Sequence, residues 1–435
     1  MKVPARIIVP VAFAAFLAGM LLVFLWWQIS QSTAILSDPL SFLKPDMKAD
    51  MASTVTEVSI DPRDKALMYL REGDLLALRG EWKEAQVAYE AAVKENGGLP
   101  ALRKLARAQL QRRDISGLRS TLNKMRSAGA RSEDLLLLES IVSLRAGELL
   151  EAQEILEGAA DSPQKHYGLA LLAIIQGNHD IAQSELTHVI NGWEPVLRSY
   201  ARTLQAAYDE FLLFPEGSNL HLITLLARAL AQSQECELAL PLLVQVTTGN
   251  DDYRDAWIVQ GYCELVTERS KEALASLEQA YNLDPQKPEI QYFLARAYRA
   301  LDQHENAITF FEYALANGFE PESEIRRLIA EEALESGNAA VALAQYDALT
   351  QMEDATFEMF EGFITASLAL GNHEEAFLKA TQATARWAQD ARAFELLGWA
   401  SMETDRTDQA REAFQKALSI NPNLKSVQEK LAELE

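Results

Sequence analysis

In this chain, the residue types that most often act in catalysis or metal binding do not have the spacing that such sites need. Six histidines are present, and no pair has the spacing of a zinc site: His166, His179, His188, His221, His304 and His373. The sequence has no H-E-x-x-H metal motif, no phosphate-binding P-loop, no dinucleotide fingerprint and no nucleophile elbow. We therefore predict that the protein is not an enzyme and that it needs no cofactor and no metal. An enzyme with a site of unfamiliar form is the alternative, which a metal or cofactor bound to the purified protein would reveal.

The local sequence around two of the histidines indicates a structural role. His179 and His373 each follow a Gly-Asn pair and precede an acidic residue. The asparagines of these pairs, Asn178 and Asn372, can cap a following helix, so the pattern is typical of a turn between paired helices. Acidic residues are abundant elsewhere, but they fall on the outer faces of the predicted helices, where charges are usually solvated.

The composition limits both the fold class and the kinds of partner. The 435 residues carry a net charge of −23, and the isoelectric point is near 4.8. We predict no nucleic-acid partner, because phosphates are bound by a basic face. Ala, Leu, Glu and Gln fill the body of the chain without sustained alternation of apolar and polar residues, so the predicted fold is all-α.

Pairs of amphipathic helices are predicted from a pattern that is clearest between residues 255 and 285. Gly261 and Ala273 are small where the two helices of this pair would cross, and larger side chains there would force the helix axes apart. Pro285 cannot continue the second helix, so it begins the link to the next pair. The alanine position recurs at intervals of 34 or 35 residues, as Ala273, Ala307, Ala342, Ala376 and Ala410.

A period of 34 with these residue types resembles the tetratricopeptide repeat family. The best-preserved unit contains Leu397, Gly398, Ala410, Phe414 and Ala417. The resemblance implies an α-solenoid of about ten helix pairs, in which the first helix of each pair lines a concave surface that binds other proteins.

The repeats fall into two blocks. The next alanine equivalent to Ala182 is Ala239. It follows 57 residues later, which is one period plus 23 residues. We assign the excess to an extra helix, which a Pro-Glu-Gly turn signal ends. A polar amphipathic helix at the C-terminus resembles the cap that a repeat array needs. The predicted bounds are 62–193 for the first block, 194–217 for the connecting helix and turn, 218–422 for the second block and 423–435 for the capping helix.

The N-terminal residues predict a membrane anchor. Residues 7–27 include no charged residue and are long enough to cross ~30 Å of hydrocarbon as a helix. A cleaved signal peptide is the alternative, but its apolar region is usually only ~7–15 residues long. The leader, residues 1–6, is basic, whereas the far flank has no basic residue before Lys44, which places the N-terminus in the cytoplasm. For a bacterium this predicts a single-pass inner-membrane protein whose array lies in the periplasm, beyond a spacer over residues 28–61.

Two cysteines, Cys236 and Cys263, do not have the spacing of a metal site. Cys236 is predicted at the start of the second helix of one pair, and Cys263 late in the first helix of the next pair. These helices run antiparallel, so the two side chains could approach each other. Two interpretations stay open: a pair of small buried thiols, or a disulfide, which only an oxidising compartment would permit.

A dense run of basic residues lies in the second unit, whose repeat pattern is the weakest. Between Leu102 and Arg131 the chain carries nine basic residues against Asp114 alone. One interpretation is a docking patch for an acidic partner, for lipid headgroups or for the acidic block of a second copy. The other is an exposed face that keeps one helix pair soluble. The candidate docking residues are Arg103, Lys104, Arg107, Arg112, Arg113, Arg119, Lys124 and Arg126.

The family resemblance also places ten residues in the concave groove of the second block. They are Asp255, Ile258, Tyr262, Tyr292, Arg296, Arg299, Arg327, Glu331, Trp399 and Met402. Aromatic and arginine side chains are typical anchors of protein interfaces. The alternative is that these side chains pack on the adjacent helix.

These predictions favour a membrane-anchored scaffold that binds and organises proteins during assembly of a bacterial envelope complex. The complex would be of the pilus, secretion, polysaccharide or cytochrome-maturation type. The expected partners are other proteins, chiefly membrane or envelope complex subunits, and pairing with a second copy is an open possibility. The second hypothesis is a cytoplasm-facing adaptor or regulator that presents clients to a membrane enzyme or protease. A topology reporter fused after Glu435 distinguishes the two.

Overall fold

The computed structural model describes residues 65–214 and 216–434, which fold into 22 helices packed in pairs. The predicted all-α solenoid is thus confirmed for this part of the chain. The predicted leader (1–6), membrane helix (7–27) and spacer (28–61) lie outside the described residues. Among the residues that are described, no helix is long and apolar enough to cross a membrane.

Four helix pairs form the first block, and one longer helix follows them. The pairs are α3 (Lys65–Leu78) with α4 (Trp82–Lys94), α5 (Gly98–Gln111) with α6 (Ile115–Ser127), α7 (Ser132–Arg145) with α8 (Leu149–Glu157), and α9 (Pro163–Ile175) with α10 (His179–Asn191). The longer helix is α11 (Pro195–Phe211).

Six pairs form the second block, and a final helix packs on the last of them. The pairs are α12 (Asn219–Gln232) with α13 (Cys236–Gly249), α14 (Arg254–Val266) with α15 (Ser270–Leu283), α16 (Pro288–Arg299) with α17 (His304–Ala316), α18 (Glu322–Glu335) with α19 (Ala339–Thr350), α20 (Phe357–Ala369) with α21 (His373–Arg386), and α22 (Ala391–Glu403) with α23 (Thr407–Ile420). The final helix is α24 (Lys425–Leu434).

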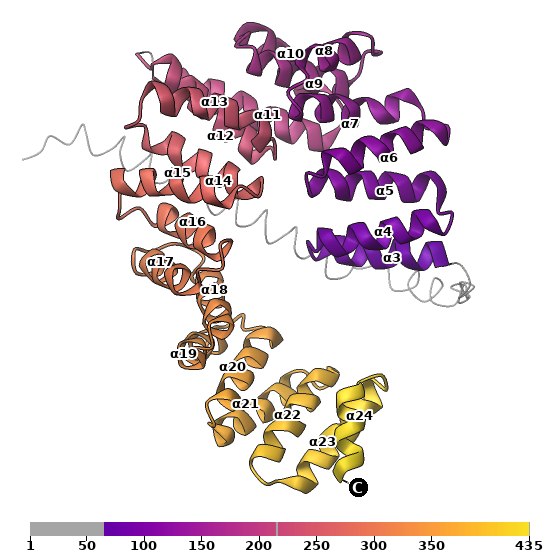
Figure 1. Cartoon of the computed structure of the whole chain (residues 1–435), viewed down its shortest axis with the longest axis vertical. Helices are drawn as coiled ribbons and strands as arrows, with labels where there is room; N and C mark the ends of the chain where they lie inside the picture. The colour runs from indigo at the N-terminus through magenta and orange to yellow at the C-terminus, as the bar shows by residue number, and fades with distance from the viewer. Residues whose placement is uncertain (1–64, 215, 435) are drawn as a thin grey trace, which may run out of the picture.

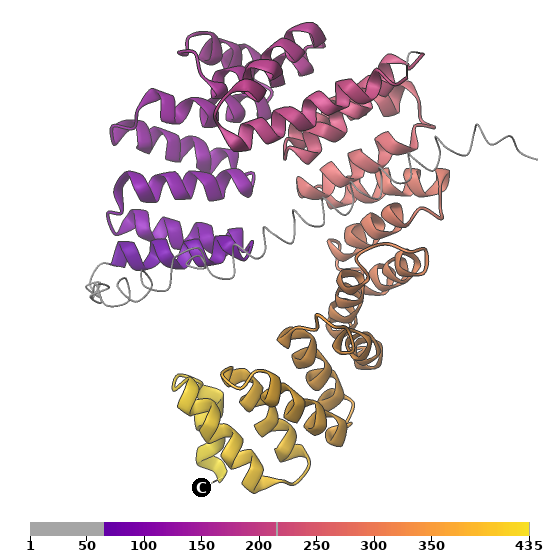
Figure 2. The same ribbon diagram turned by 180° about the vertical axis from the view of Figure 1, so that it is seen from behind.

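The path of the stack turns back on itself at α11. Figure 1 shows the first block rising along one side of the molecule, α11 crossing near the top and the second block descending along the other side. The view from behind in Figure 2 shows the same arrangement. Because of this turn, α7 contacts α13, although the two helices are far apart in the sequence.

Small residues let the two helices of a pair approach closely, as the sequence predicts. A methyl group placed on Gly261 would lie 2.4 Å from Cγ of Leu277. One placed on Gly398 would lie 2.3 Å from Cε1 of Phe414. Ala273 is completely buried, and so are its four counterparts in the later units. The recurring small positions therefore face neighbouring helices and not solvent.

The Gly-Asn-His sequences occupy turns between paired helices. Gly177 and Gly371 have φ angles of 74° and 76°, a left-handed conformation that favours glycine. Asn178 stands at the N-cap position of α10, but its side chain makes no capping hydrogen bond, and the same holds for Asn372 at α21. The expected caps are therefore absent at both sites. The side-chain amide of Asn178 instead donates to Oε1 of Gln176 at 3.1 Å.

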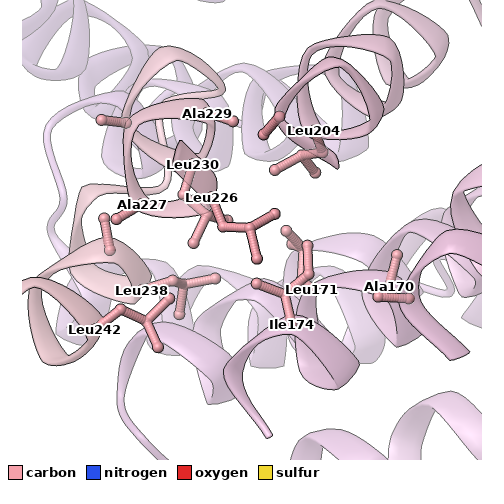
Figure 3. Close-up of a cluster of buried hydrophobic side chains, with 14 of the residues drawn as sticks. Ala170, Leu171, Ile174, Leu204, Leu226, Ala227, Ala229, Leu230, Leu238 and Leu242 are labelled. Carbon is pink, nitrogen blue, oxygen red and sulfur yellow. The ribbon is translucent and has the colours of Figure 1, made fainter. Parts of the chain in front are cut away.

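The two blocks and α11 share one apolar core. Leu171 of α9, Leu204 of α11, Leu230 of α12 and Leu238 of α13 are all buried in the same cluster (Figure 3). Apolar burial contributes about 1.5–3 kcal/mol for each such side chain. The connecting helix is therefore an integral layer of the solenoid, and the core fixes how the second block follows the first.

Candidate partner-binding surfaces

The first helices of the pairs form the inner layer of the solenoid. α12 contacts α14, α14 contacts α16 and α20 contacts α22, although each pair of these helices is separated in sequence by a second helix. A curved stack brings the helices of its inner layer together and spreads those of its outer layer. The ten predicted groove residues all lie on inner-layer helices: α14, α16, α18 and α22.

The ten residues differ in how much of their side chains a partner could reach. Asp255 and Arg327 are exposed, and Tyr292 is buried, with 8% of its surface accessible. The others are half-buried: Ile258, Tyr262, Arg296, Arg299, Glu331, Trp399 and Met402. The inner layer of the second block thus combines half-buried aromatic and aliphatic side chains with charged ones.

Tyr292 is part of the wall of the groove. Its ring stacks on Phe319 with centroids 4.3 Å apart, and its hydroxyl donates to Oε1 of Glu324 at 2.7 Å. Burial raises the pKa of this tyrosine. Tyr262 and Trp399 each have one ring neighbour, Phe293 and Phe414, at centroid distances of 5.5 and 5.4 Å. They keep more accessible surface than Tyr292, so they are the better candidate anchors.

Ion pairs already engage most of the groove arginines. Arg299 pairs with Glu331 at 3.1 Å and with the buried carboxylate of Glu332 at 2.8 Å. Arg327 also pairs with Glu331, one helical turn away. A partner that used these guanidinium groups would have to replace the existing pairs. The carboxylate of Asp255 also makes an ion pair, with Arg254, but it is 55% exposed.

The sequence-based prediction missed two further charged residues of the inner layer, Arg392 and Glu361. Arg392 of α22 lies 3.6 Å from the carboxylates of both Glu358 and Glu361 of α20. Partial burial raises the pKa of Glu361. The repeat period contains the signal that could have identified them, because Glu361 follows Arg327 by 34 residues and Arg392 follows Glu358 by 34.

The basic run of the second unit is largely neutralised by acidic residues of neighbouring helices. The ion pairs are Arg103 with Asp134, Lys104 with Asp74, Arg113 with Glu237, Arg119 with Glu148 and Arg126 with Glu139. Arg112 donates to Oε1 of Gln86 at 2.9 Å. Only Arg107 and Lys124 among the eight candidates make no such bond to a described residue. Much of the excess positive charge of the basic run is therefore engaged in ion pairs within this chain.

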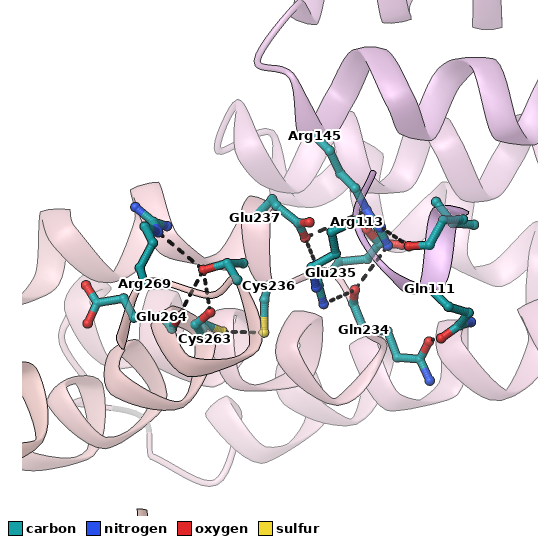
Figure 4. Close-up of polar contacts among 12 residues, drawn as sticks. Gln111, Arg113, Arg145, Gln234, Glu235, Cys236, Glu237, Cys263, Glu264 and Arg269 are labelled. Carbon is teal, nitrogen blue, oxygen red and sulfur yellow. Dashed lines mark hydrogen bonds and ion pairs between the residues drawn. The ribbon is translucent and has the colours of Figure 1, made fainter. Parts of the chain in front are cut away.

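A buried polar cluster joins the two blocks where the chain turns back. Arg145 at the end of α7 donates to Glu235 at 2.9 Å, and each side chain is 5% exposed (Figure 4). Arg145 also donates to the backbone oxygen of Gln234 at 3.1 Å, and Arg113 pairs with Glu237. A cavity of about 700 Å³ adjoins this joint. Sequence reasoning missed the cluster, because its members are about 90 to 124 residues apart.

Sequence comparison identifies three stretches of the chain as tetratricopeptide repeats. They are residues 224–288, 268–332 and 391–424. The chain is a tetratricopeptide repeat protein. No curated protein sequence matches it. Repeat proteins of this family bind other proteins, and this one is a protein-binding scaffold.

Solved structures similar to this tetratricopeptide repeat protein share little sequence with it. YrrB, described as a TPR protein with an unusual peptide-binding site, is 19% identical with a TM-score of 0.39, over 43% of this chain and 96% of its own. PilW, a type IV pilus biogenesis factor, is 16% identical with a TM-score of 0.36, over 49% and 99%. TTC0263, a TPR protein of Thermus thermophilus, is 18% identical with a TM-score of 0.30, over 48% and 100%. With TM-scores below 0.5, these likenesses carry no conclusion about this chain.

The two cysteines of the tetratricopeptide repeat protein meet between α13 and α14. Both side chains are fully buried thiols, and the Sγ atoms lie 2.7 Å apart. Burial raises the pKa of the Cys263 thiol, so the reactive thiolate is scarce. The pair lies directly beside the joint, because Cys236 stands between Glu235 and Glu237 (Figure 4).

Oxidation by a small-molecule disulfide is expected to join Cys236 to Cys263 slowly and to stabilise the repeat protein by about 2–4 kcal/mol. The two thiols are oxidised to one protein disulfide, and the reagent is reduced to two thiols. Mass spectrometry of the denatured protein after alkylation, with and without prior reduction, measures the bond. Alkylation of both cysteines without reduction, after prolonged oxidation, would contradict the prediction.

A buried carboxylate links three helices of the second block. Glu264 of α14 accepts hydrogen bonds from Ser276 of α15 at 2.6 Å and from Gln260 at 3.1 Å, and Gln260 accepts one from Thr247 of α13. Burial raises the pKa of Glu264 above its ordinary value. Ionisation therefore costs more in the folded protein than in the unfolded chain, so above the folded-state pKa this residue lowers stability.

Replacing Glu264 by glutamine is expected to raise the melting temperature at pH values above the folded-state pKa of the glutamate, where burial makes ionisation costly. The hydroxyl of Ser276 can rotate to accept from the new amide. The difference from the unaltered protein should disappear as the pH falls below about 4, because both side chains are then neutral. Melting curves recorded from about pH 3 to about pH 8 measure it. A difference that is the same at every pH would show that the charge is not the cause.

Proposed function

We propose that this protein is a single-span, membrane-anchored scaffold of the bacterial envelope, and that its array organises subunits of an envelope complex during assembly. The anchor is residues 7–27, and the array lies on the periplasmic side. The inner layer of the second block supports this proposal, because it presents half-buried aromatic side chains among accessible carboxylates. An anchored array also raises the local concentration of whatever it binds beside the membrane.

The charge of the inner layer indicates the chemistry of the partner. The carboxylates of Asp255, Glu289 and Glu358 are 55%, 50% and 65% exposed, although they pair with Arg254, Lys287 and Arg392. Glu361 and Glu395 are half-buried nearby in the same block. Two of the three groove arginines, Arg299 and Arg327, pair within the chain with Glu331 and Glu332. We expect the bound segment to carry lysine or arginine beside an aromatic or aliphatic anchor, and its binding to weaken as salt is added.

A double variant in the groove tests the proposed surface. Tyr262→Ala with Trp399→Ala should reduce crosslinking of the partner in membranes by about tenfold or more, because loss of a central aromatic anchor typically costs about 2 kcal/mol or more. The matched control is Val87→Ala with Leu378→Ala, which removes two exposed side chains from second helices. Equal capture by both variants, at equal expression, would contradict a groove function.

The side of the membrane is tested separately. A reporter that is active only outside the cytoplasm, fused after Glu435, is expected to be active, and one that is active only in the cytoplasm to be silent. The reverse result would favour an adaptor that presents clients to a membrane enzyme or protease from the cytoplasmic side. It would leave the groove result unaffected.

A further inference from the structure

The third unit of the array is short by about one turn of helix. α7 begins at Ser132 and α9 begins at Pro163, so the unit spans 31 residues, three fewer than the period of 34. The shortening falls on α8, which has 9 residues, whereas the second helices of the other described pairs have 12, 13 or 14. The end of α8 therefore covers less of its neighbours than the corresponding helix ends do.

A pocket of about 880 Å³ lies where α8 stops short, and we call it the edge pocket. α7 and α9 begin at this edge of the first block, α8 ends there, and the link from α10 to α11 passes beside it. Its apolar wall consists of Leu136, Ile155, Ala159 and Pro163. The wall can accommodate the aliphatic part of a bound side chain.

A tryptophan stands at the rim of the edge pocket. Trp193 lies in the link between α10 and α11, and 74% of its surface is exposed. Contact with a partner could remove much of this large ring from water, and tryptophan is among the residues that most often dominate the affinity of an interface.

The edge pocket is acidic. Its described lining includes four carboxylates and one cation: Glu133, Asp134, Glu139, Asp161 and Arg131. Asp134 and Glu139 make ion pairs with arginines of this chain. Glu133 makes none among the described residues, and the side chain of Asp161 is 90% exposed, with His166 as its one described partner. The charge of the pocket therefore favours a cation.

We propose that the edge pocket binds a lysine- or arginine-containing segment of a partner protein. The stem of a basic side chain lies on the apolar wall and against the ring of Trp193, and its charged end meets the accessible carboxylates of Glu133 and Asp161. This pocket belongs to the first block, so the inference does not depend on the inner layer of the second block. The scaffold then has a place for a basic segment in each block.

A peptide that carries both chemical features tests the role of Trp193. The probe is dye-labelled Lys-Leu-Lys-Lys-Leu-Lys, and fluorescence anisotropy measures its Kd. The full-length protein carries Tyr262→Ala with Trp399→Ala, which removes the candidate anchors of the second block. Adding Trp193→Ala should raise the Kd at least about tenfold. Adding Ile181→Ala, a 54% exposed residue outside the pocket lining, should leave it unchanged. Equal values would overturn the proposal.

Reversing charges tests the acidic wall. Glu133→Lys with Asp161→Lys, in the same background, should weaken binding of the peptide at least about tenfold, because each unpaired carboxylate becomes a cation. The matched control is Glu151→Lys with Asp180→Lys, which changes two exposed acids in the first turns of α8 and α10, at the opposite edge. The control should weaken binding by no more than about twofold at physiological salt, since charges beyond about 8 Å are screened. Equal effects would reduce the binding to general attraction and overturn the proposal.

The same measurements separate this inference from the groove function. If the peptide binds the unaltered protein but not the Tyr262→Ala, Trp399→Ala variant at up to about 1 mM, all of the binding belongs to the second block. That result would overturn the edge pocket and leave the groove function standing. Unchanged binding in the same variant, lost on adding Trp193→Ala, would support the edge pocket by itself.

Discussion

Replacing Arg145 by alanine is expected to lower the free energy of unfolding by about 3–5 kcal/mol. The guanidinium is buried between the two blocks, where it neutralises Glu235 and donates to the backbone oxygens of Gln234 and Leu110. Its removal leaves a buried carboxylate without a counter-charge and two backbone acceptors without this donor. Urea denaturation followed by circular dichroism measures the change, and hydrogen exchange should show it first in α5, α7, α12 and α13.

Two further variants test whether the buried charge is the cause. Adding Glu235→Gln to Arg145→Ala removes the stranded charge and should recover part of the loss. Arg126→Ala breaks an ion pair in which the arginine is 60% exposed, and exposed pairs contribute about 0–1 kcal/mol. If Arg145→Ala were no more damaging than Arg126→Ala, the joint would not depend on this cluster.

Replacing Gly398 by leucine is expected to loosen the C-terminal units, with a cost of about 1–3 kcal/mol or more from overpacking. A Cβ at this position would lie 2.3 Å from Cε1 and 2.4 Å from Cδ1 of Phe414, which is itself fully buried. α22 and α23 would have to separate. Leucine forms helices better than glycine by about 1 kcal/mol, which offsets only part of this cost.

Hydrogen exchange by segment distinguishes this local effect from a general one. Because each repeat contacts chiefly its neighbours, protection should fall in α22, α23 and α24 and persist in α3 to α10. The matched control is Glu403→Leu, which adds the same side chain to an exposed position of the same helix. Loss of protection in the first block, or an equal effect of the control, would contradict the prediction.

The groove residues show what repeat periodicity can predict about a side chain and what it cannot predict. The register of small residues assigns Tyr262 and Trp399 to the first helices of their pairs, and they lie in α14 and α22, because a helix face is fixed by spacing along the sequence. The same register cannot say how a side chain is used. Tyr292 occupies an inner position but stacks on Phe319, which stands in the link that precedes α18. Links vary from unit to unit, so their contacts do not follow the period.

The basic run of the second unit illustrates the same limit. Its density is plain in the sequence, yet its counter-charges come from three other helices and a turn: Asp74, Asp134, Glu139, Glu148 and Glu237. Charge pairing across a solenoid depends on which side chains of adjacent units face each other. A count along the chain therefore shows an excess of charge where the folded protein has ion pairs.

The sequence by itself determined the helical class, the 34-residue unit and the positions where paired helices cross, because these depend on periodicity and side-chain volume within one unit. Only the tertiary structure decided that the path turns back at α11, that Arg145 meets Glu235 across the joint, and that most of the inner-layer arginines are already paired. Those contacts join residues from different units, and many of them lie far apart along the chain. Their formation depends on how whole blocks pack together, which no local pattern of residues encodes.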